Sequence, residues 1–185
     1  MLYHVVRKLD PNGIAYVSED RKGDGLVLGL SVKENMTISS LGFFSTFFKI
    51  DKKSEKNSVD EYVEKFSIKT PTIDQKIKNL SGGNQQKVCL AKAFTMDPEV
   101  LFVSEPTRGI DVGAKKLVLD TLKEYNSTKG TTIIITSSEI EELRSVCDRI
   151  AIINEGKVAG ILPPTADILE FGKMMVGVLK EGNDE

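Results

Sequence analysis

Tryptophan is absent from this 185-residue sequence, and histidine, cysteine and aromatic residues are scarce. With so few aromatic residues, a core must rest mainly on valine, isoleucine and leucine. Cys89 and Cys147 have no C-x-x-C spacing and no nearby histidine cluster, so we interpret both as small apolar side chains. Since His4 is the single histidine, a histidine-based catalytic centre or a multi-histidine metal site would have to include it.

Long apolar runs and an excess of basic residues are also missing. No apolar stretch approaches the ~20 residues that a membrane helix needs, and the N-terminal segment lacks the apolar core of a signal peptide. We therefore expect a soluble, cytoplasmic chain that reaches the inner face of the cell membrane only through a partner. Lys plus Arg number 25 against 27 Asp plus Glu, which argues against a general nucleic-acid binder.

The second half of the sequence alternates apolar strands with amphipathic helices. Predicted strands lie at 100–103, 132–136 and 150–153, and predicted helices at 81–95, 112–125 and from 139 onward. Gly130 stops the second helix, and the turn at 154–157 favours a hairpin with residues 158–160. This order is typical of an α/β domain whose parallel sheet is buried on both faces.

The first half is more helical and more polar. Residues 14–17 form a short apolar run, residues 49–58 are interpreted as a solvated loop or helix–helix connection, and residues 59–66 have the spacing of a helix. Ser31 and Glu34 have the spacing of a capping box, which predicts a helix from Ser31 to about Leu41. The stretch 31–79 is therefore interpreted as a helical subdomain inserted into the α/β domain.

The sharpest chemical element is the segment Leu80-Ser81-Gly82-Gly83-Asn84-Gln85-Gln86-Lys87. Two glycines at a helix start leave backbone N–H groups uncovered, and the helix dipole adds positive potential there. Ser81 either caps the helix or offers its hydroxyl outward. Such a terminus suits contact with a terminal phosphate, although an ordinary Ser-Gly-Gly turn before a helix explains the same residues.

Polar residues also follow two of the predicted strands. Glu105 follows the strand at 100–103, and the cluster 136–139 closes the strand at 132–136. The carboxyl ends of parallel strands are where open α/β sheets bind ligands. With the phosphate-binding helix start, these residues predict a nucleotide-hydrolysis site. Glu105 is then a general base for the attacking water, or alternatively a helix-capping or salt-bridging carboxylate.

Several blocks in this order resemble the ABC-type ATPases. Leu80–Gln86 resembles the signature motif, Val100–Pro106 the Walker B strand with its catalytic glutamate, Gly109–Asp111 the D-loop, and Thr136–Glu139 the switch region. More narrowly, the chain resembles the second of the two ABC domains in the ATPase of ribose/galactose/xylose-type sugar importers. The blocks that carry this are Ser18–Lys22, Ser31–Asn35, Asn84–Lys87 and Glu105–Lys115, and the resemblance runs from about Gly13 to Gly177.

The resemblance implies roles for particular residues. Nucleotide-binding positions are Ser81, Gly82, Gly83, Asn84, Gln85 and Glu19; catalytic positions are Glu105, Asp111 and Ser138; and Ser104 takes the position of the aspartate that helps hold Mg²⁺. ATP and Mg²⁺ are the implied cofactors, and both are expected only in a complete assembly. The implied partners are a transmembrane permease and an upstream ABC domain or polypeptide that carries the P-loop.

The sequence departs from the family pattern at several positions. No G-x-x-x-x-G-K-[ST] occurs, so the main cradle for the β- and γ-phosphates is not within these residues. Ser104 is a weak, neutral substitute for aspartate. Ser138 stands at the switch histidine, and Glu19 stands where many ABC domains have the Q-loop glutamine. We therefore expect a P-loop NTPase-like α/β domain that lacks its N-terminal strands and P-loop.

Three functions stay open at this point. The first is the partial ATP-binding and ATP-hydrolysing subunit of a carbohydrate importer, inactive alone because it has no P-loop. The second is a non-catalytic interaction module from a split or truncated gene. The third, an ABC-like ATPase of DNA repair or chromosome structure, is disfavoured because those proteins usually carry long coiled coils and no sustained heptads occur.

We expect one partial domain over residues 1–185. Its parts are a helical insert at about 31–79, the signature helix with the core parallel sheet at about 80–160, and a C-terminal helix and tail at 161–185. An open sheet edge and uncovered apolar surface are expected to make the isolated chain self-associate.

Overall fold

The computed structural model describes residues 13–46 and 49–178, so His4 lies outside the described residues. The chain divides into two compact units between Thr136 and Ser137. The strands of the first unit are β1 (Ile14–Val17), β2 (Ser45–Thr46), β3 (Lys49–Ile50), β4 (Val100–Ser104) and β5 (Thr132–Thr136). Its α-helices are α1 (Val32–Thr37), α2 (Leu41–Phe44), α3 (Lys52–Lys65), α4 (Gly82–Phe94) and α5 (Val112–Lys129).

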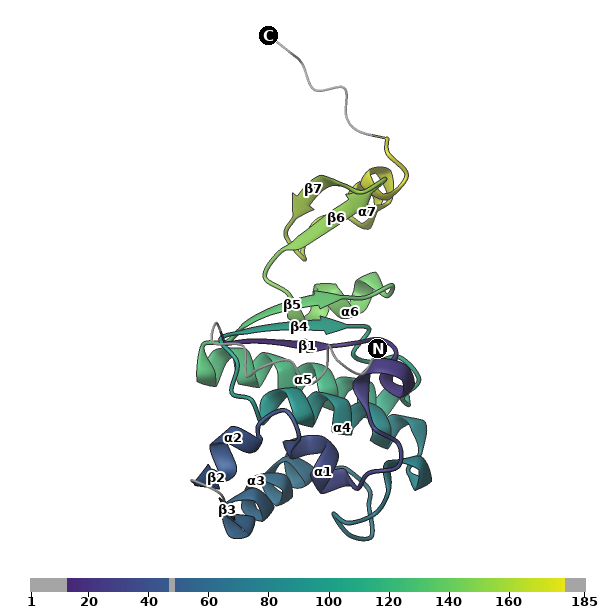
Figure 1. Cartoon of the computed structure of the whole chain (residues 1–185). Coiled ribbons are helices and arrows are strands. Elements are labelled where there is room, and N and C mark those ends of the chain that lie inside the picture. The colour runs from purple at the N-terminus through teal and green to yellow at the C-terminus, as the bar shows by residue number, and fades with distance from the viewer. Residues whose placement is uncertain (1–12, 47–48, 179–185) are drawn as a thin grey trace. The chain divides into compact units, whose positions relative to one another are not determined.

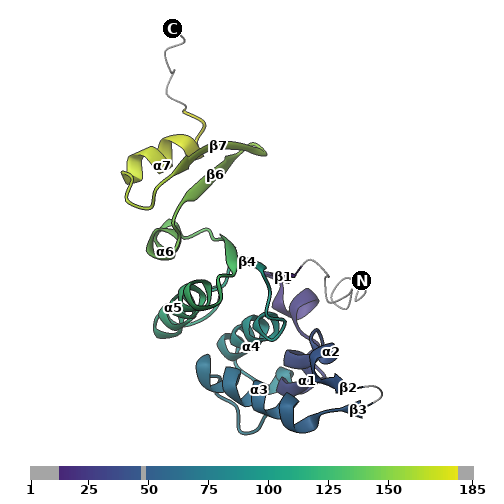
Figure 2. The same cartoon turned by 90° about the vertical axis from the view of Figure 1, so that its left-hand side faces the viewer.

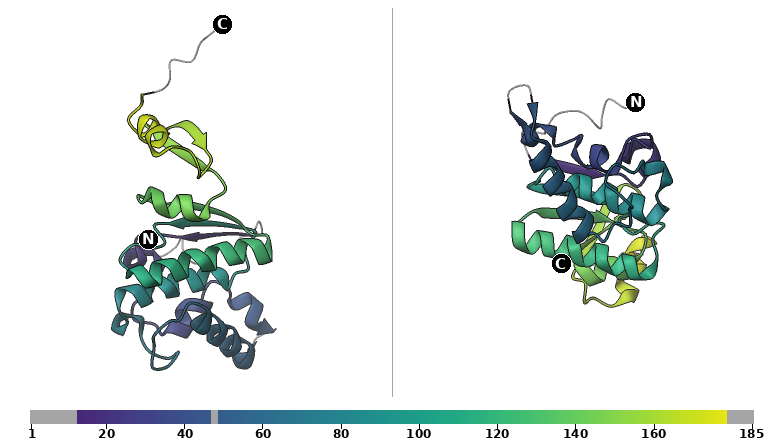
Figure 3. Two further views of the ribbon diagram at one scale, coloured as in Figure 1. Left: turned by 180° about the vertical axis from the view of Figure 1, so that it is seen from behind. Right: turned by 90° about the horizontal axis from the view of Figure 1, so that it is seen from below.

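The first unit is built on a three-stranded parallel sheet in the order β1-β4-β5. The strands β4 and β5 and the helices α4 and α5 lie where the sequence pattern predicts them, and β1 coincides with the short apolar run at 14–17. Ser81 caps α4, Asp111 caps α5, and Gly130 ends α5 in the left-handed conformation, with φ of 73°. Figures 1 and 3 show both helices on the same side of the strands. The predicted α/β architecture is confirmed.

The opposite face of this sheet is exposed. The register aligns Tyr16, Phe102 and Ile134 in one row across the three strands. Their side chains are 65%, 39% and 44% exposed, respectively. The prediction of a sheet buried on both faces is therefore wrong for the described residues. A continuously apolar strand indicates that both faces of the sheet carry apolar side chains, but it does not show that another layer of the same chain covers each face. The uncovered apolar surface that we expected is present.

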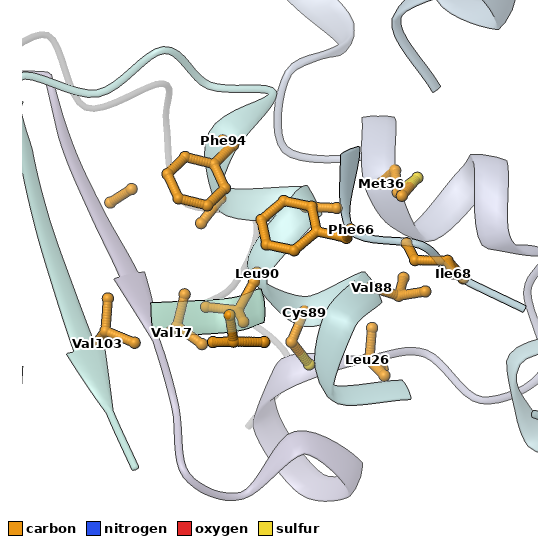
Figure 4. Close-up of a cluster of buried hydrophobic side chains, with 14 of the residues drawn as sticks. Val17, Leu26, Met36, Phe66, Ile68, Val88, Cys89, Leu90, Phe94 and Val103 are labelled. Carbon is orange, nitrogen blue, oxygen red and sulfur yellow. The ribbon is translucent and has the colours of Figure 1, made fainter. Parts of the chain in front are cut away.

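The core of the first unit surrounds α4, with the sheet and α5 on one side and residues of α1 and α3 on the other. Alternate strand residues, including Ala15, Val17, Leu101 and Val103, point into it, and most of α4 is buried. Figure 4 shows side chains of this core, with the ring of Phe66 beside that of Phe94 at a centroid distance of 5.4 Å. Cys89 is also buried there as a free thiol, and its burial raises its pKa to about 12.

The helices α1, α2 and α3 lie on the side of α4 away from the sheet (Figure 2). The capping box is confirmed, since Ser31 and Glu34 exchange both hydrogen bonds. The helix it opens ends at Thr37, earlier than predicted, and α2 follows after a turn.

The prediction of a solvated loop at 49–58 is wrong. Asp51 accepts hydrogen bonds from the Lys53 and Ser54 amides and starts the 14-residue helix α3. Its inward side includes Val59 and Glu55, which accepts a hydrogen bond from Thr37 at 2.8 Å. A helix that buries so little hydrophobic surface reads as a polar loop in the sequence.

The second unit consists of α6 (Ile140–Val146), the strands β6 (Ile150–Asn154) and β7 (Lys157–Leu162), and α7 (Ile168–Met175). The predicted hairpin is confirmed, since β6 and β7 pair antiparallel through the turn at 154–157. Ile150, Ile152 and Phe171 form a separate small core. Thus β6 pairs with β7 and, within the described residues, does not extend the parallel sheet.

Candidate functional site

The N-terminus of α4 presents an exposed serine hydroxyl whose acceptor positions are already used. Ser81 Oγ accepts hydrogen bonds from Asn84 Nδ2 at 3.0 Å and, at the longer distance of 3.4 Å, from the Asn84 amide. Asn84 Oδ1 in turn accepts from the Lys69 amide at 2.9 Å, which fixes the orientation of the amide group. With both lone pairs engaged, the hydroxyl proton of Ser81 is left to donate outward.

Gly82 and Gly83 follow, and both are glycine for reasons of packing as well as of amide exposure. A Cβ at Gly82 would lie 2.8 Å from Arg21 Nη2, and one at Gly83 would lie 3.3 Å from Ile110 Cγ2. The start of α4 is therefore pressed against two other segments of the chain. The N–H groups of its first turn have no acceptor within the helix, and together with the helix dipole they make this surface suitable for an anion.

Gln85 is placed differently from its neighbours in the motif. It is buried, and its Nε2 donates to the carbonyls of Ile77 and Leu80, both at 3.2 Å. The side chain thus joins α4 to the short 3-10 helix at Ile77–Asn79. Its amide donors are used inside the protein, so the structure does not bring Gln85 to the surface formed by Ser81, Gly82 and Gly83.

Ser104 and Glu105 lie at the carboxyl end of β4. Ser104 pairs in register with Thr136 of β5, whose Oγ1 donates to Ser104 Oγ at 3.1 Å. The Glu105 amide donates to the Thr136 carbonyl at 2.8 Å. Glu105 itself has a φ of 47°, in the left-handed region that L residues with long side chains rarely occupy. Such backbone strain is concentrated at functional sites.

The loop that follows β4 is tied to the segment after β1. Arg108 Nη1 lies 3.4 Å from Glu19 Oε2, and Arg21 Nη1 donates to the Arg108 carbonyl at 3.2 Å. The segment after β1 and the loop after β4 are therefore joined twice, once through the side chain of Arg108 and once through the side chain of Arg21. Glu19, predicted at the Q-loop position, is an ion-pair partner here and is exposed on the surface.

Asp111 ends this loop and caps α5. Its carboxylate accepts from the Ala114 amide at 3.0 Å, and this hydrogen bond lowers its pKa from the usual 3.8. Ser138 is exposed in the second unit, just before α6. Ser81, Gly82, Gly83 and Asn84 therefore form one surface, and Ser104 and Glu105 form another at the strand ends.

Sequence reasoning named Arg21 and Thr136 only as members of the blocks 18–22 and 136–139, without a role of their own. Arg21 lay inside a polar cluster with no positional pattern, and its role depends on contacts with residues 87 positions away. Thr136 carried a better signal, since it ends the strand beside Ser104, but the register of the two strands was needed to pair their hydroxyls.

The residues at the strand ends do not by themselves make a magnesium site. Mg²⁺ needs near-octahedral oxygen coordination, usually including one or two carboxylates. Ser104 and Thr136 offer two neutral hydroxyls, and among residues 13–46 and 49–178 no group of three or more His, Cys, Asp or Glu side chains is placed to hold a metal.

The fold and the glycine-led start of α4 define an ATP-binding cassette of the ABC type. The sequence pattern of the ABC transporter family matches residues 4–108, and the chain belongs to this family. Solved structures agree in fold. The chain superposes on the dimeric ATP-binding cassette MJ0796 bound to ADP and Pi with a TM-score of 0.73 at 22% identity, covering 84% of this chain and 65% of that one.

Among curated relatives, the chain is similar to ribose import ATP-binding proteins RbsA. It is 51% identical over 152 residues to RbsA of Clostridium perfringens (strain SM101 / Type A), and 47% identical over 152 residues to RbsA of Clostridium tetani. Each match covers 82% of this chain and 30% of the relative, so the chain spans under a third of their length. No helix in the described part of the chain is both long and apolar enough to cross a membrane.

Proposed function

We propose that this chain supplies the signature side of an ATP site in the ATP-binding component of an importer of ribose or a related carbohydrate. The observation that carries the proposal is the start of α4. There the exposed Ser81 has its acceptor positions filled by Asn84, which leaves its hydroxyl proton to donate, beside the backbone amides of Gly82 and Gly83 in the first turn. Carbohydrate as the cargo rests on the similarity to RbsA.

Ser81, Gly82 and Gly83 donate to the terminal phosphate of ATP held by another surface, and Asn84 acts by orienting Ser81. Glu105, held at the end of β4, serves as general base for the attacking water. Asp111 fixes the loop between Glu105 and α5 by capping α5. The remaining positions, Gln85 and Glu19 for nucleotide and Ser138 for the switch, stay predictions from the family resemblance.

The phosphate cradle and most of the Mg²⁺ ligands come from outside these 185 residues. The uncovered row of Tyr16, Phe102 and Ile134 supports this, because an apolar sheet face of this kind is stable when another layer covers it. The covering layer is the partner that brings the P-loop, and Ser104 contributes at most a weak neutral ligand to the ion. A membrane permease is the second partner, which places the assembly at the cytoplasmic face of the membrane.

The same exposed row favours a second candidate, a non-catalytic module that docks through its sheet. In that case the chain associates with a partner but adds nothing to nucleotide binding. Nucleotide affinity separates the two functions, because only the first requires contact between Ser81 and a phosphate.

A binding experiment tests the proposal. The partner is an ABC domain that carries a P-loop and whose own signature serine is replaced by alanine, hereafter the complementing domain. Adding this chain is expected to tighten the binding of a fluorescent ATP analogue to the complementing domain by roughly tenfold, about 1.4 kcal/mol, and Ser81→Ala is expected to remove the gain. Association without any change in nucleotide affinity would support the docking module instead.

A further inference from the structure

Arg21 lies where three segments of the first unit meet. It begins a π-helical turn over Arg21–Gly25, which Asp20 caps by accepting from the Lys22 and Gly23 amides. Its Nη1 donates to the Arg108 carbonyl at 3.2 Å. The same guanidinium lies against Gly82 at the start of α4, 2.8 Å from the Cβ position, and against Gly109, at 3.2 Å. One planar group thus fills the space that two glycines leave.

The two segments touched by Arg21 also contact each other directly. A Cβ at Gly82 would be 3.8 Å from the Gly109 carbonyl oxygen, and one at Gly83 would be 3.3 Å from Ile110 Cγ2. The ion pair between Arg108 and Glu19 adds a second link from the 108–110 loop back to the segment after β1. A displacement of Arg21 therefore moves the start of α4 and the 108–110 loop together.

Local stability does not explain this placement. A cation beside a helix N-terminus meets the positive end of the helix dipole, which is unfavourable. The Arg21 Nε is also buried, with no hydrogen-bond partner among the described residues. A lysine cannot reproduce the contact, because the planar fork of the guanidinium is what lies between Gly82 and Gly109.

We propose that Arg21 is a positioning residue that sets the start of α4 against the 108–110 loop, and so sets the direction in which Ser81 faces. This inference rests on the proposed function, since Ser81 matters for ATP only if it contacts phosphate. It adds that the segment after β1 is coupled to the signature helix through one guanidinium. A side chain at either Gly82 or Gly109 would occupy the space that the Arg21 guanidinium fills, which is one reason why both positions are glycine.

The first test is kinetic and uses the chain mixed with the complementing domain. Arg21→Ala and Arg21→Lys are each expected to lower kcat about tenfold or more, with a smaller change in KM for ATP. Lys22→Ala, which removes a neighbouring exposed cation, is the matched control and is expected to keep wild-type kcat. Full kcat in either Arg21 variant would overturn the proposal.

A double-mutant cycle then asks whether Arg21 acts through the helix start. Gly82→Ala forces the guanidinium out and is expected to lower kcat about as much as Arg21→Ala does. In the Arg21→Ala background, Gly82→Ala is expected to have less than a threefold further effect. Two losses that simply multiply would mean that the residues act independently, which contradicts the proposal.

Hydrogen exchange of backbone amides, measured on the chain alone, tests the positioning role of Arg21 without requiring ATP binding or turnover. The Gln85 amide donates to the Ser81 carbonyl and the Arg108 amide to the Glu105 carbonyl, so both report their segments. Arg21→Ala is expected to speed exchange at both amides several-fold, with the melting temperature little changed, and Lys22→Ala is expected to leave both unchanged. Faster exchange confined to residues 21–25 would overturn the proposal even if ATP turnover is never observed.

Discussion

The hydroxyl of Thr136 donates a hydrogen bond to the hydroxyl oxygen of Ser104 across the ends of two parallel strands, at 3.1 Å. Two neutral side chains therefore occupy the edge of the sheet where a metal-binding carboxylate is expected from the family resemblance. This single hydrogen bond joins the two strand ends through neutral groups, with Thr136 as the donor and Ser104 as the acceptor. Glu105 follows directly, held by its amide, which donates to the Thr136 carbonyl at 2.8 Å, and the family resemblance predicts that it is the general base.

Ser104→Asp is expected to strengthen the dependence on Mg²⁺. A carboxylate at this position adds a hard, charged oxygen ligand where a neutral hydroxyl now stands. In the mixture with the complementing domain, the Mg²⁺ concentration for half-maximal ATP turnover should fall roughly tenfold, about 1.4 kcal/mol of ion binding. Ser104→Asn, similar in size but neutral, is the control. An equal shift with both variants would show that charge at this position is irrelevant.

Asn84→Ala is expected to lower ATP turnover while leaving the fold in place. The substitution removes one of the two donors to Ser81 Oγ, so the hydroxyl is free to rotate, whereas the residue 84 amide still donates to Ser81 Oγ and the cap of α4 is kept. The loss of unfolding free energy should be about 2 kcal/mol, because the substitution removes two hydrogen bonds, one to Ser81 Oγ and one from the Lys69 amide.

Lys69→Ala is the matched control for this change, because only the Lys69 backbone amide contacts Asn84. Unfolding in urea and steady-state turnover measure the two effects. Unchanged turnover in Asn84→Ala would mean that Ser81 needs no orienting partner.

Glu105 and Glu155 allow backbone strain to be separated from catalysis. Their φ angles are 47° and 48°, and Glu155 belongs to the tight turn between β6 and β7, where Gly156 follows with a φ of 76°. Asparagine tolerates the left-handed region better than glutamate does. Asparagine at either position should therefore raise the unfolding free energy by about 0.5–1 kcal/mol.

Only Glu105→Asn should abolish ATP turnover, as Glu105→Gln should, because both remove the carboxylate from the end of β4. Glu155→Asn should turn over ATP at the wild-type rate. A Glu105→Gln chain that still supports turnover with the complementing domain would exclude Glu105 as the general base.

Acid should weaken the capping box at the start of α1. Hydrogen bonds from the Ser31 amide and hydroxyl hold the pKa of Glu34 below its usual 4.5. The unfolded state then binds more protons than the folded state, so this contribution to stability is full above about pH 4.5 and is lost as pH falls through the lower, folded pKa. Glu34→Gln should flatten the fall in unfolding free energy across that range, measured by urea titrations. A slope identical to wild type would contradict the assignment.

The isolated chain should self-associate through the exposed sheet face. Phe102→Thr shortens the apolar row of Tyr16, Phe102 and Ile134 and should weaken association roughly tenfold, about 1.4 kcal/mol. Phe43→Thr is the control, since Phe43 is 60% exposed on α2 and lies outside the row. Sedimentation velocity over a range of concentrations measures the effect, and a monomer at every concentration would rule this surface out.

Much of the fold could be predicted because local signals agreed with tertiary packing. Ser31 and Ser81 cap the helices as their positions in the sequence predict, and Gly130 ends α5 in the conformation glycine favours. The helix predicted at 59–66 is confirmed as the second half of α3, but its first half, at 52–58, could not be predicted, since its inward side there is carried by few residues such as Glu55. The exposed sheet face could not be predicted from apolar strands alone, because covering it depends on another layer.

The site could be predicted where a sequence motif by itself determines the local backbone, as at Ser81, Gly82 and Gly83, which begin α4. It was not predictable where contacts join distant segments. Gln85 belongs to the same motif but turns inward to the carbonyls of Ile77 and Leu80, because the helical period places it on the buried side of α4. The orientation of Ser81 by Asn84 depends on the Lys69 amide, which no spacing in the sequence reveals.

ATP turnover by mixtures tests the central claim most directly. The chain alone is expected to hydrolyse ATP negligibly, the complementing domain alone likewise, and the two together at a rate at least tenfold above the sum of their separate rates. Ser81→Ala in this chain should return the mixture to that sum. Steady hydrolysis by the purified chain alone, abolished by Glu105→Gln, would contradict the account, as would a mixture whose rate does not depend on Ser81.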